Sequence, residues 1–183
     1  SELLTDSRKL TKPKTALFFA ISGNRLDGHN YISDLYRKGV RNFIVERELE
    51  STFEDANVIV VSNAVKALQD ISRHHRQNFD FPIIGITGSN GKTIIKEWLF
   101  QLLDKDFKIV RSPKSYNSQI GVPLSVWNIK AKNNLGIFEA GISEPDEMQN
   151  LQKVIQPTIG IFANIGSAHG QNFINDSHKV KEK

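Results

Sequence analysis

Short apolar runs alternate with amphipathic stretches along most of this chain of 183 residues. Runs rich in β-branched and aromatic residues, bounded by polar or glycine-containing turns, predict strands. The apolar positions of the intervening stretches recur every three or four residues, as in helices that pack on one face. The first part of the chain is predicted to hold strands at 17–21, 42–45 and 58–61 and helices at 32–38 and 64–76.

A short linker separates these elements from a second series. Pro82 keeps Phe81 out of the helical region, so the linker is predicted to join two domains, 1–79 and 80–183. Strands that alternate with helices favour parallel sheets, so we expect an α/β protein whose second domain is a doubly wound parallel sheet. The second domain is predicted to hold a strand from residue 83, strands at 107–110, 135–140 and 159–163, and helices after residue 93, at 122–127 and at 146–154.

A glycine-rich turn connects the first strand of the second domain to a helix. Its sequence, Gly-Ser-Asn-Gly-Lys-Thr, is shorter than the standard phosphate loop G-x-x-x-x-G-K-[ST], because its two glycines are only three positions apart. Gly88 and Gly91 permit positive φ and the close approach of phosphate oxygens to the main chain. Lys92 would neutralise phosphate charge, and the Thr93 hydroxyl would hold Mg²⁺.

The helix after this turn carries an apolar stripe and would point its N-terminus at the phosphates. The stripe comprises Ile94, Ile95, Trp98, Leu99, Leu102 and Leu103. A plain glycine turn between a strand and a helix is the alternative, but the two flanking elements favour a nucleotide site. We predict ATP as the ligand, bound by Gly88, Ser89, Asn90, Gly91, Lys92, Thr93 and Ile94.

Three further candidates follow later strands, because ligands of a parallel α/β sheet bind at the carboxyl ends of its strands. Glu139 closes an apolar run, where a nucleotide-using enzyme places a magnesium ligand; a simple acidic cap is the alternative. His169 lies in a glycine-flanked loop and is a candidate metal ligand, although histidines are common in loops. Asn117, in a polar loop before a helix, is a candidate for substrate contact, although a capped loop explains the same residues.

Two motifs in the first domain are equally ambiguous from their chemistry. Asp6-Ser7-Arg8 and Asp27-Gly28-His29 each combine a turn with hydrogen-bonding side chains that could hold a diphosphate, yet many surface loops have the same composition. The basic run at 73–76 is interpreted as a solvated helix face.

Composition narrows the class of protein. The net charge of +4 is scattered along the chain, which suits a polyanionic small molecule better than a nucleic acid. The absence of cysteine excludes a disulfide scaffold. No apolar run has the length of a membrane span and the first residues do not form a signal peptide, so we expect a soluble cytoplasmic protein without membrane insertion. The oligomeric state is not predicted.

Taken together, these pieces resemble the Mur ligases, the ATP-dependent amide-bond-forming enzymes of peptidoglycan precursor synthesis. The motifs of the first domain look like the family's uridine-nucleotide-binding domain. The turn, the segment 116–125, Glu139-Ala140-Gly141 and the segment 164–169 are similar to its ATP loop, the segment that follows and its magnesium-site motifs. The resemblance implies a truncated P-loop ATPase domain at 80–183 and a set of residues that bind UDP-N-acetylmuramoyl-tripeptide: Ser7, Arg8, Asp27, Gly28, His29 and Asn117.

The resemblance also implies a reaction. A substrate carboxylate attacks the γ-phosphate of ATP, and the amine of D-alanyl-D-alanine then displaces phosphate from the acyl phosphate. Lys92, Glu139, His169 and Lys183 would be the catalytic residues, and Thr93 would hold Mg²⁺ together with the last three. Lys183 stands fourteen positions after His169, where the family carries a carbamylated lysine. The family's remaining domains are absent from the sequence, so we expect this chain alone not to ligate.

Several features distinguish this sequence within the family. Ile94 and Ser118 depart from residues that many members carry. Ile94, the segment 112–119 and Val126-Trp127 resemble fused ligase–alanine racemase proteins. The pair Ala168-His169 favours the type that adds D-alanyl-D-alanine over the type that forms the tripeptide. The alternatives are another ligase of the superfamily and a non-catalytic nucleotide-binding module.

Overall fold

The computed structural model describes residues 1–23 and 26–164. The chain forms two compact units that divide between Leu68 and Gln69, within helix α2 (Ala64–Arg76). The boundary predicted at 79–80 follows the end of this helix, and a domain of residues 1–79 stays a prediction.

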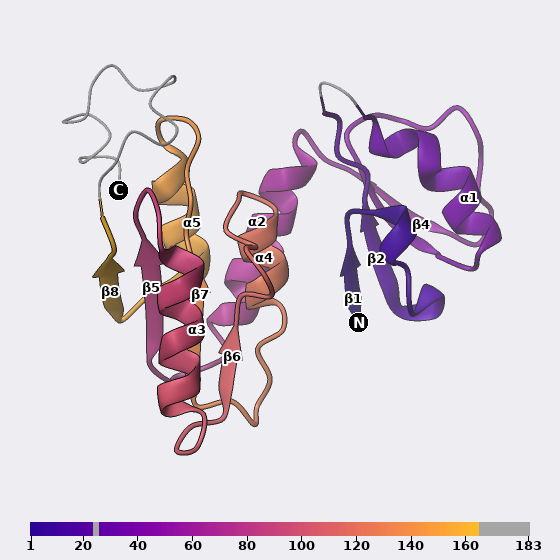
Figure 1. The fold of residues 1–183 in the computed structure, drawn as a ribbon. Helices are drawn as coiled ribbons and strands as arrows, with labels where there is room; N and C mark the ends of the chain where they lie inside the picture. Colours follow the sequence, from indigo (N-terminus) through magenta and orange to yellow (C-terminus); the bar gives the residue numbers. More distant parts are fainter. Residues whose placement is uncertain (24–25, 165–183) are drawn as a thin grey trace. The chain divides into compact units, whose positions relative to one another are not determined.

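The first unit is built on a four-stranded parallel sheet in the order β1-β2-β3-β4 (Figure 1). The strands are β1 (Glu2–Leu4), β2 (Ala16–Phe19), β3 (Asn42–Val45) and β4 (Asn57–Val60). Between them lie α1 (Ile32–Arg37) and three 3₁₀ turns, Ser7–Lys9, Pro13–Thr15 and Gly28–Tyr31. The predicted strands and helix are confirmed with ends that differ by at most two residues, whereas β1 and the 3₁₀ turns were not predicted.

The core of this unit forms because apolar residues from the sheet meet the buried side of α1. Phe18 of β2 and Phe43 of β3 are buried with their ring centroids 6.4 Å apart in an edge-on arrangement, and Ile32 and Leu35 of α1 join the same cluster. The connections after β1 and β2 leave the sheet at the carboxyl ends of these paired strands. Both predicted substrate motifs therefore lie at one edge of the sheet.

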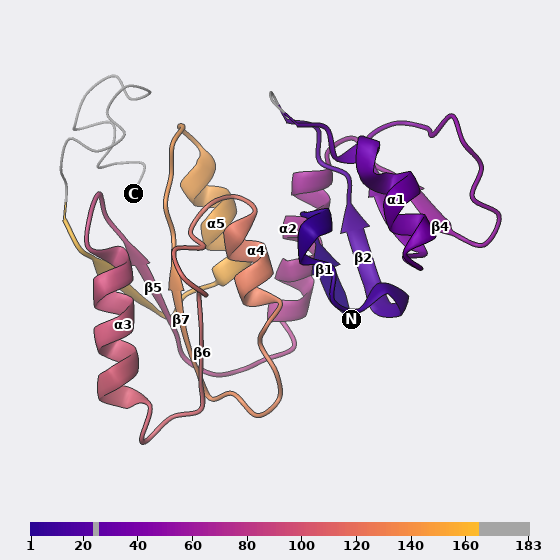
Figure 2. The same cartoon turned by 45° about the vertical axis from the view of Figure 1, so that its right-hand side comes forward.

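The second unit contains a second parallel sheet, in the order β6-β7-β5-β8 (Figure 2). β5 occupies a central position, so the turn that follows it is flanked by the ends of β7 and β8. The elements are β5 (Ile83–Thr87), α3 (Lys92–Leu103), β6 (Ile109–Arg111), α4 (Gly121–Val126), β7 (Leu135–Glu139), α5 (Glu147–Ile155) and β8 (Ile159–Phe162).

Helices cover both faces of this sheet, which confirms the doubly wound arrangement. On one face, Ile95 and Leu99 of α3 pack against Ile86 and Ile137 of the sheet. The other face is covered by α4 and α5. The glycine-rich turn consequently lies between a buried strand and a helix that packs back on the same sheet.

The sheet covers only part of the apolar stripe of α3. Ile94, Trp98 and Leu102 are 56%, 63% and 73% exposed. Each of them lies one residue, or about 100° of helical rotation, from the partly buried row of Ile95, Leu99 and Leu103.

The basic run at the end of α2 is solvated only in part: Arg73 and His74 are exposed, whereas Arg76 is buried. The guanidinium of Arg76 is buried and donates to the backbone carbonyls of Ile155 and Phe79. The ring of His75 packs against Trp127, with centroids 4.5 Å apart.

No helix within the described residues is long and apolar enough to span a membrane.

Candidate functional site

The glycine-rich turn after β5 has the backbone that a phosphate loop requires. Gly88 and Gly91 have φ angles of 139° and 82°, which side-chain-bearing residues rarely adopt. Gly91 is the residue before α3, so the first N–H groups of that helix lie at the turn and have no hydrogen-bond partner within the helix. A helix start of this kind attracts anions because its backbone N–H groups and the helix dipole act together.

The lysine of the turn folds back over it. The Nζ atom of Lys92 donates to the carbonyl of Gly88 over 2.8 Å. Burial lowers the pKa of Lys92, and the nearby carboxylate of Glu139 opposes that shift. A partly desolvated cation at the glycine-rich turn complements the negative charge of a nucleotide phosphate.

Asn164, which follows β8, also holds the turn. Its carbonyl accepts from the N–H of Ser89 and its side-chain oxygen accepts from the N–H of Asn90, each over 2.9 Å. Asn164 begins the segment that sequence reasoning linked to the metal site. The contact between Asn164 and the turn was not predicted, because it depends on the pairing of β5 with β8, which the local sequence does not show.

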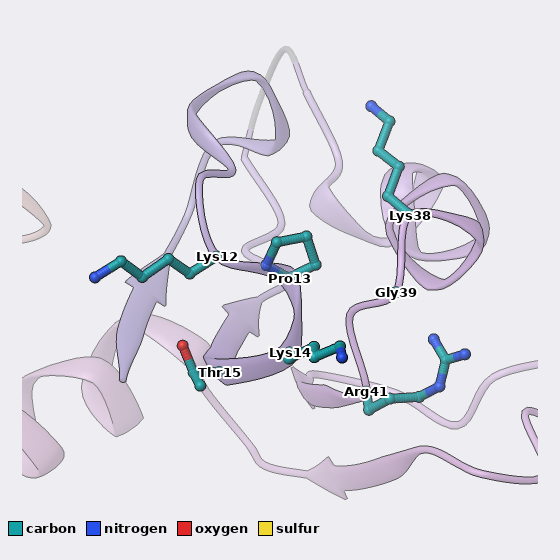
Figure 3. Close-up of a pocket in the computed structure, with 7 residues that line it drawn as sticks. All are labelled: Lys12, Pro13, Lys14, Thr15, Lys38, Gly39 and Arg41. Atoms are coloured by element: carbon teal, nitrogen blue, oxygen red, sulfur yellow. The ribbon is translucent and has the colours of Figure 1, made fainter.

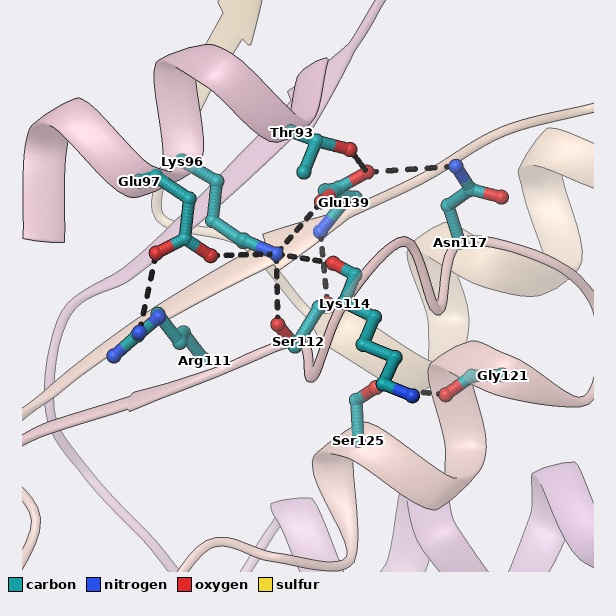
Figure 4. A network of polar contacts seen from close by, with 10 residues as sticks. All are labelled: Thr93, Lys96, Glu97, Arg111, Ser112, Lys114, Asn117, Gly121, Ser125 and Glu139. Atoms are coloured by element: carbon teal, nitrogen blue, oxygen red, sulfur yellow. Dashed lines mark hydrogen bonds and ion pairs between the residues drawn. The ribbon is translucent and has the colours of Figure 1, made fainter.

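Glu139 lies at the centre of a polar network beside the turn (Figure 4). Its carboxylate is fully buried, and Oε2 accepts from the Thr93 hydroxyl over 3.0 Å and from the Asn117 amide over 3.4 Å. The backbone N–H of Glu139 donates to the Ser112 hydroxyl. Three residues that sequence reasoning selected separately, Thr93, Asn117 and Glu139, are therefore in direct contact.

Lys96 supplies the positive charge next to this carboxylate. The lysine lies one turn into α3, is completely buried, and places Nζ 3.0 Å from Oε1 of Glu139. The same ammonium donates to the carbonyl of Ser112 over 2.9 Å and to that of Lys114. Sequence reasoning missed Lys96, because a lysine in an amphipathic helix is ordinarily solvated.

The donors around Glu139 fit a magnesium ion. A carboxylate and a hydroxyl supply oxygen ligands of the kind that Mg²⁺ prefers, whereas the Asn117 amide presents its nitrogen to Glu139. Within residues 1–23 and 26–164, Oε1 of Glu139 accepts no hydrogen bond and faces only the Lys96 ammonium. The same described residues contain no group of three or more His, Asp or Glu side chains placed to hold a metal. His169 and Lys183, the other predicted metal ligands, lie outside the described residues.

The Asp27-Gly28-His29 motif forms a second polar cluster, in the first unit. The buried ring of His29 bonds to Asp27 through Nδ1, over 2.6 Å, and accepts from the N–H of Glu46 at Nε2, over 3.0 Å. Arg47 donates to the other carboxylate oxygen of Asp27 over 2.6 Å, and this contact is the main reason that the pKa of Asp27 lies well below its usual range. Both nitrogens of His29 are therefore engaged within the protein, so the ring positions Asp27 and the end of β3.

Gly28 is fixed by close packing. A Cβ atom at this position would lie 2.7 Å from the nitrogen of Ile21 and 2.8 Å from the Cα of Ala20. The residues that directly follow β2 thus pack on the backbone of the motif. Glu46 and Arg47 were not predicted, since nothing in their local sequence shows that the end of β3 meets the connection after β2.

The Asp6-Ser7-Arg8 motif is more open. Asp6 caps the 3₁₀ turn by accepting from the N–H of Arg8. The Arg8 side chain, 85% exposed, also bonds to the Asp6 carboxylate through Nε and Nη2. Arg8 is thus an accessible cation at the carboxyl edge of the sheet, as a diphosphate ligand requires.

Cavities lie at both edges of the sheet among the described residues of the first unit. One, of about 280 Å³, is lined by His29, Arg47 and Ser33 and lies at the carboxyl edge of the sheet. A larger one, of about 700 Å³, is lined by Thr15 and Arg41 among others, which precede β2 and β3 (Figure 3). The larger cavity therefore lies at the amino-terminal edge, opposite the predicted substrate motifs, and it contains none of the predicted residues.

Comparison with known proteins identifies relatives over nearly the whole chain. The family model "Mur ligase middle domain" matches residues 86–183, and "Mur ligase family, catalytic domain" matches residues 1–76. The UDP-N-acetylmuramoyl-tripeptide–D-alanyl-D-alanine ligases of Borreliella burgdorferi and Bacillus subtilis are 36% and 30% identical over 92% of this chain.

Solved structures agree with these relatives. MurF from Acinetobacter baumannii superposes with a TM-score of 0.90 at 28% identity over 100% of the chain. MurF ligase from Thermotoga maritima, solved in complex with ADP, superposes with a TM-score of 0.87 at 29% identity over 99% of the chain. The chain spans only 36–38% of those two curated relatives and 39–41% of those two structures.

Proposed function

Because the chain belongs to the Mur ligase family, we propose that it is the UDP-precursor-binding and ATP-binding portion of a ligase. The complete enzyme adds D-alanyl-D-alanine to UDP-N-acetylmuramoyl-tripeptide in the cytoplasm. The relatives that carry this name in B. burgdorferi and B. subtilis support the assignment. The observation that carries it is the contact of Thr93, at the glycine-rich turn, with the buried carboxylate of Glu139.

ATP is bound at the start of α3 in this proposal. The backbone of residues 88–93 and the Lys92 ammonium receive the phosphates, and Ile94 flanks them. Thr93 and Glu139 hold Mg²⁺, together with His169 and Lys183. The ion would offset negative charge as phosphoryl transfer proceeds.

The protein's own groups position the reacting atoms. Lys92 brings positive charge to the γ-phosphate while the substrate carboxylate attacks it and ADP leaves. Asn117, in contact with Glu139 over 3.4 Å, lies where the acceptor substrate would meet the metal site. The amine of D-alanyl-D-alanine then attacks the acyl carbon, and the phosphate group leaves.

The first unit binds the uridine diphosphate portion of the substrate. Ser7 and Arg8 approach it from the connection after β1, and Asp27, Gly28 and His29 from the connection after β2. The exposed guanidinium of Arg8 supplies the charge for the diphosphate. The buried His29 keeps the second motif in place.

Separate titrations of the purified chain test the two binding functions. UDP-N-acetylmuramoyl-tripeptide is expected to raise the thermal midpoint, and Arg8→Ala is expected to abolish that effect while leaving the effect of Mg²⁺-ATP intact. Lys92→Ala is expected to give the reverse pattern. A folded wild-type chain that responds to neither ligand would favour a non-catalytic module, and D-alanyl-D-alanine-dependent phosphate release by this chain would contradict the need for the remaining domains.

A further inference from the structure

Lys96 of the second unit carries a charge although its side chain is completely buried. A buried lysine is costly unless nearby groups compensate its charge. Four groups surround its ammonium: the carboxylates of Glu139 and Glu97, at 3.0 Å and 3.2 Å, and the backbone carbonyls of Ser112 and Lys114.

These contacts divide into two kinds. The two carbonyls belong to the segment that leaves β6, so these contacts fix the path of that segment against α3. Glu139 needs a cation as well as a hydrogen-bond donor, because its carboxylate is fully buried and a buried anion without a compensating charge is strongly disfavoured. Glu97 is partly exposed and also pairs with Arg111 over 3.1 Å. A neutral donor of similar length satisfies the first need and fails the second.

The ammonium also divides the two oxygens of Glu139. Oε1 faces Lys96, while Oε2 faces Thr93 and Asn117 (Figure 4). We propose that Lys96 is a positioning residue that holds the Glu139 carboxylate with one oxygen turned toward Thr93, ready to bind Mg²⁺. This inference rests on the proposed magnesium site.

The same residue connects the two substrates' sides of the site. Lys96 lies one turn after Lys92 on α3. The segment whose carbonyls at Ser112 and Lys114 bond to Lys96 continues to Asn117. A second contact ties Asn117 to the end of β7, because its carbonyl accepts from the N–H of Gly141 over 2.8 Å. The buried ammonium of Lys96 therefore holds three parts of the site together: α3, the carboxylate of Glu139 and the segment that carries Asn117.

The test compares nucleotide affinity with and without metal in Lys96→Gln. Glutamine can donate to the carbonyls of Ser112 and Lys114 but brings no charge to Glu139. ATP affinity without Mg²⁺ is expected to stay within about twofold of wild type, because the turn and Lys92 are intact. The gain in affinity on adding Mg²⁺ is expected to fall about 10- to 100-fold, as for other residues that orient metal ligands.

Two further variants make the result specific. Lys96→Arg, which keeps the positive charge, is expected to retain most of the Mg²⁺ gain, and the exposed Lys105→Gln is expected to match wild type. An unchanged Mg²⁺ gain in Lys96→Gln, or an equal loss of affinity with and without Mg²⁺, would overturn the inference. If Lys96→Gln does not fold, the double variant with Glu97→Gln, which removes the carboxylate that Lys96 shares with Arg111, carries the same measurement.

A ligand-free measurement separates this inference from the proposed function. The ¹³C resonance of the Glu139 side-chain carboxyl is expected to move in Lys96→Gln and to stay in place in Lys105→Gln. If the wild-type chain binds no ATP, the proposed nucleotide site fails, and this resonance alone decides whether Lys96 sets the environment of Glu139. An identical resonance in wild type and Lys96→Gln would refute the positioning role.

Discussion

Replacing each glycine of the nucleotide turn by alanine tests whether its backbone is built as described. Gly88 and Gly91 both have positive φ, at 139° and 82°. Their surroundings differ: a Cβ at Gly88 would lie 2.9 Å from the Cβ of Ala163 and 3.0 Å from the nitrogen of Asn164, whereas a Cβ at Gly91 would have no neighbour within 4 Å. The two substitutions therefore separate backbone strain from crowding.

The expected losses follow from these distances. Gly91→Ala is expected to lower the free energy of unfolding by about 1–2 kcal/mol, the cost of left-handed backbone for an L-residue. Gly88→Ala is expected to lower it by about 2–6 kcal/mol, because a strained φ costs about 1–3 kcal/mol and overpacking adds about 1–3 kcal/mol. Gly160→Ala is a matched control, since its φ is not positive and its Cβ would meet nothing within 4 Å.

Urea unfolding followed by tryptophan fluorescence measures these losses. Both tryptophans, Trp98 and Trp127, belong to the second unit, so their signal reports on the unit that carries the turn. The slope of free energy against urea is expected to stay constant across the three variants, with only the midpoint changing. Equal losses for Gly88→Ala and Gly91→Ala, or a larger loss for Gly91→Ala, would refute the described crowding.

Three other predictions address both units. Because Arg47 is the main cause of the lowered pKa of Asp27, Asp27 stabilises the first unit above about pH 4, and this contribution is lost as the pH falls. Arg47→Gln should therefore move the acid-unfolding midpoint to higher pH, as followed by circular dichroism, and an unchanged midpoint would contradict the assignment. Gly28→Ala should lower the free energy of unfolding by about 1–3 kcal/mol in denaturant titrations, because its Cβ would meet the backbone of Ile21 at 2.7 Å. An unchanged free energy of unfolding would count against that packing. Thr93→Val should abolish the Mg²⁺-dependent gain in ATP affinity measured by calorimetry, whereas Thr93→Ser should keep it; equal gains in both variants would exclude the hydroxyl as a ligand.

Local sequence patterns predicted much of the fold. Strand Asn42–Val45 and helix Ala64–Arg76 begin and end at the predicted residues, because apolar periodicity and polar flanks define them without help from distant contacts. The contact between Thr93 and Glu139 also followed from sequence, since one residue follows a strand and the other ends a strand of the same parallel sheet.

The remaining features depend on contacts between distant segments. Lys96 and Arg76 are charged residues of amphipathic helices, where such residues are usually solvated. In the structure their head groups are buried and donate hydrogen bonds to backbone carbonyls of other segments. Trp98 belongs to the apolar stripe of α3 yet is 63% exposed, because periodicity cannot show how much of a helix face its own sheet covers. Such positions require the strand order, which no local pattern contains.

The most direct test of the central claim is an amide chemical-shift map of the chain titrated with ATP and then with Mg²⁺. ATP alone is expected to move the resonances of residues 88–94 most, because the phosphates bind the turn and the first turn of α3. Addition of Mg²⁺ is expected to move Thr93 further and to add Glu139 and Asn117. Shifts centred elsewhere in the chain, or a Mg²⁺ response that leaves Glu139 unmoved, would contradict the assignment of this turn and carboxylate as a Mg²⁺-ATP site.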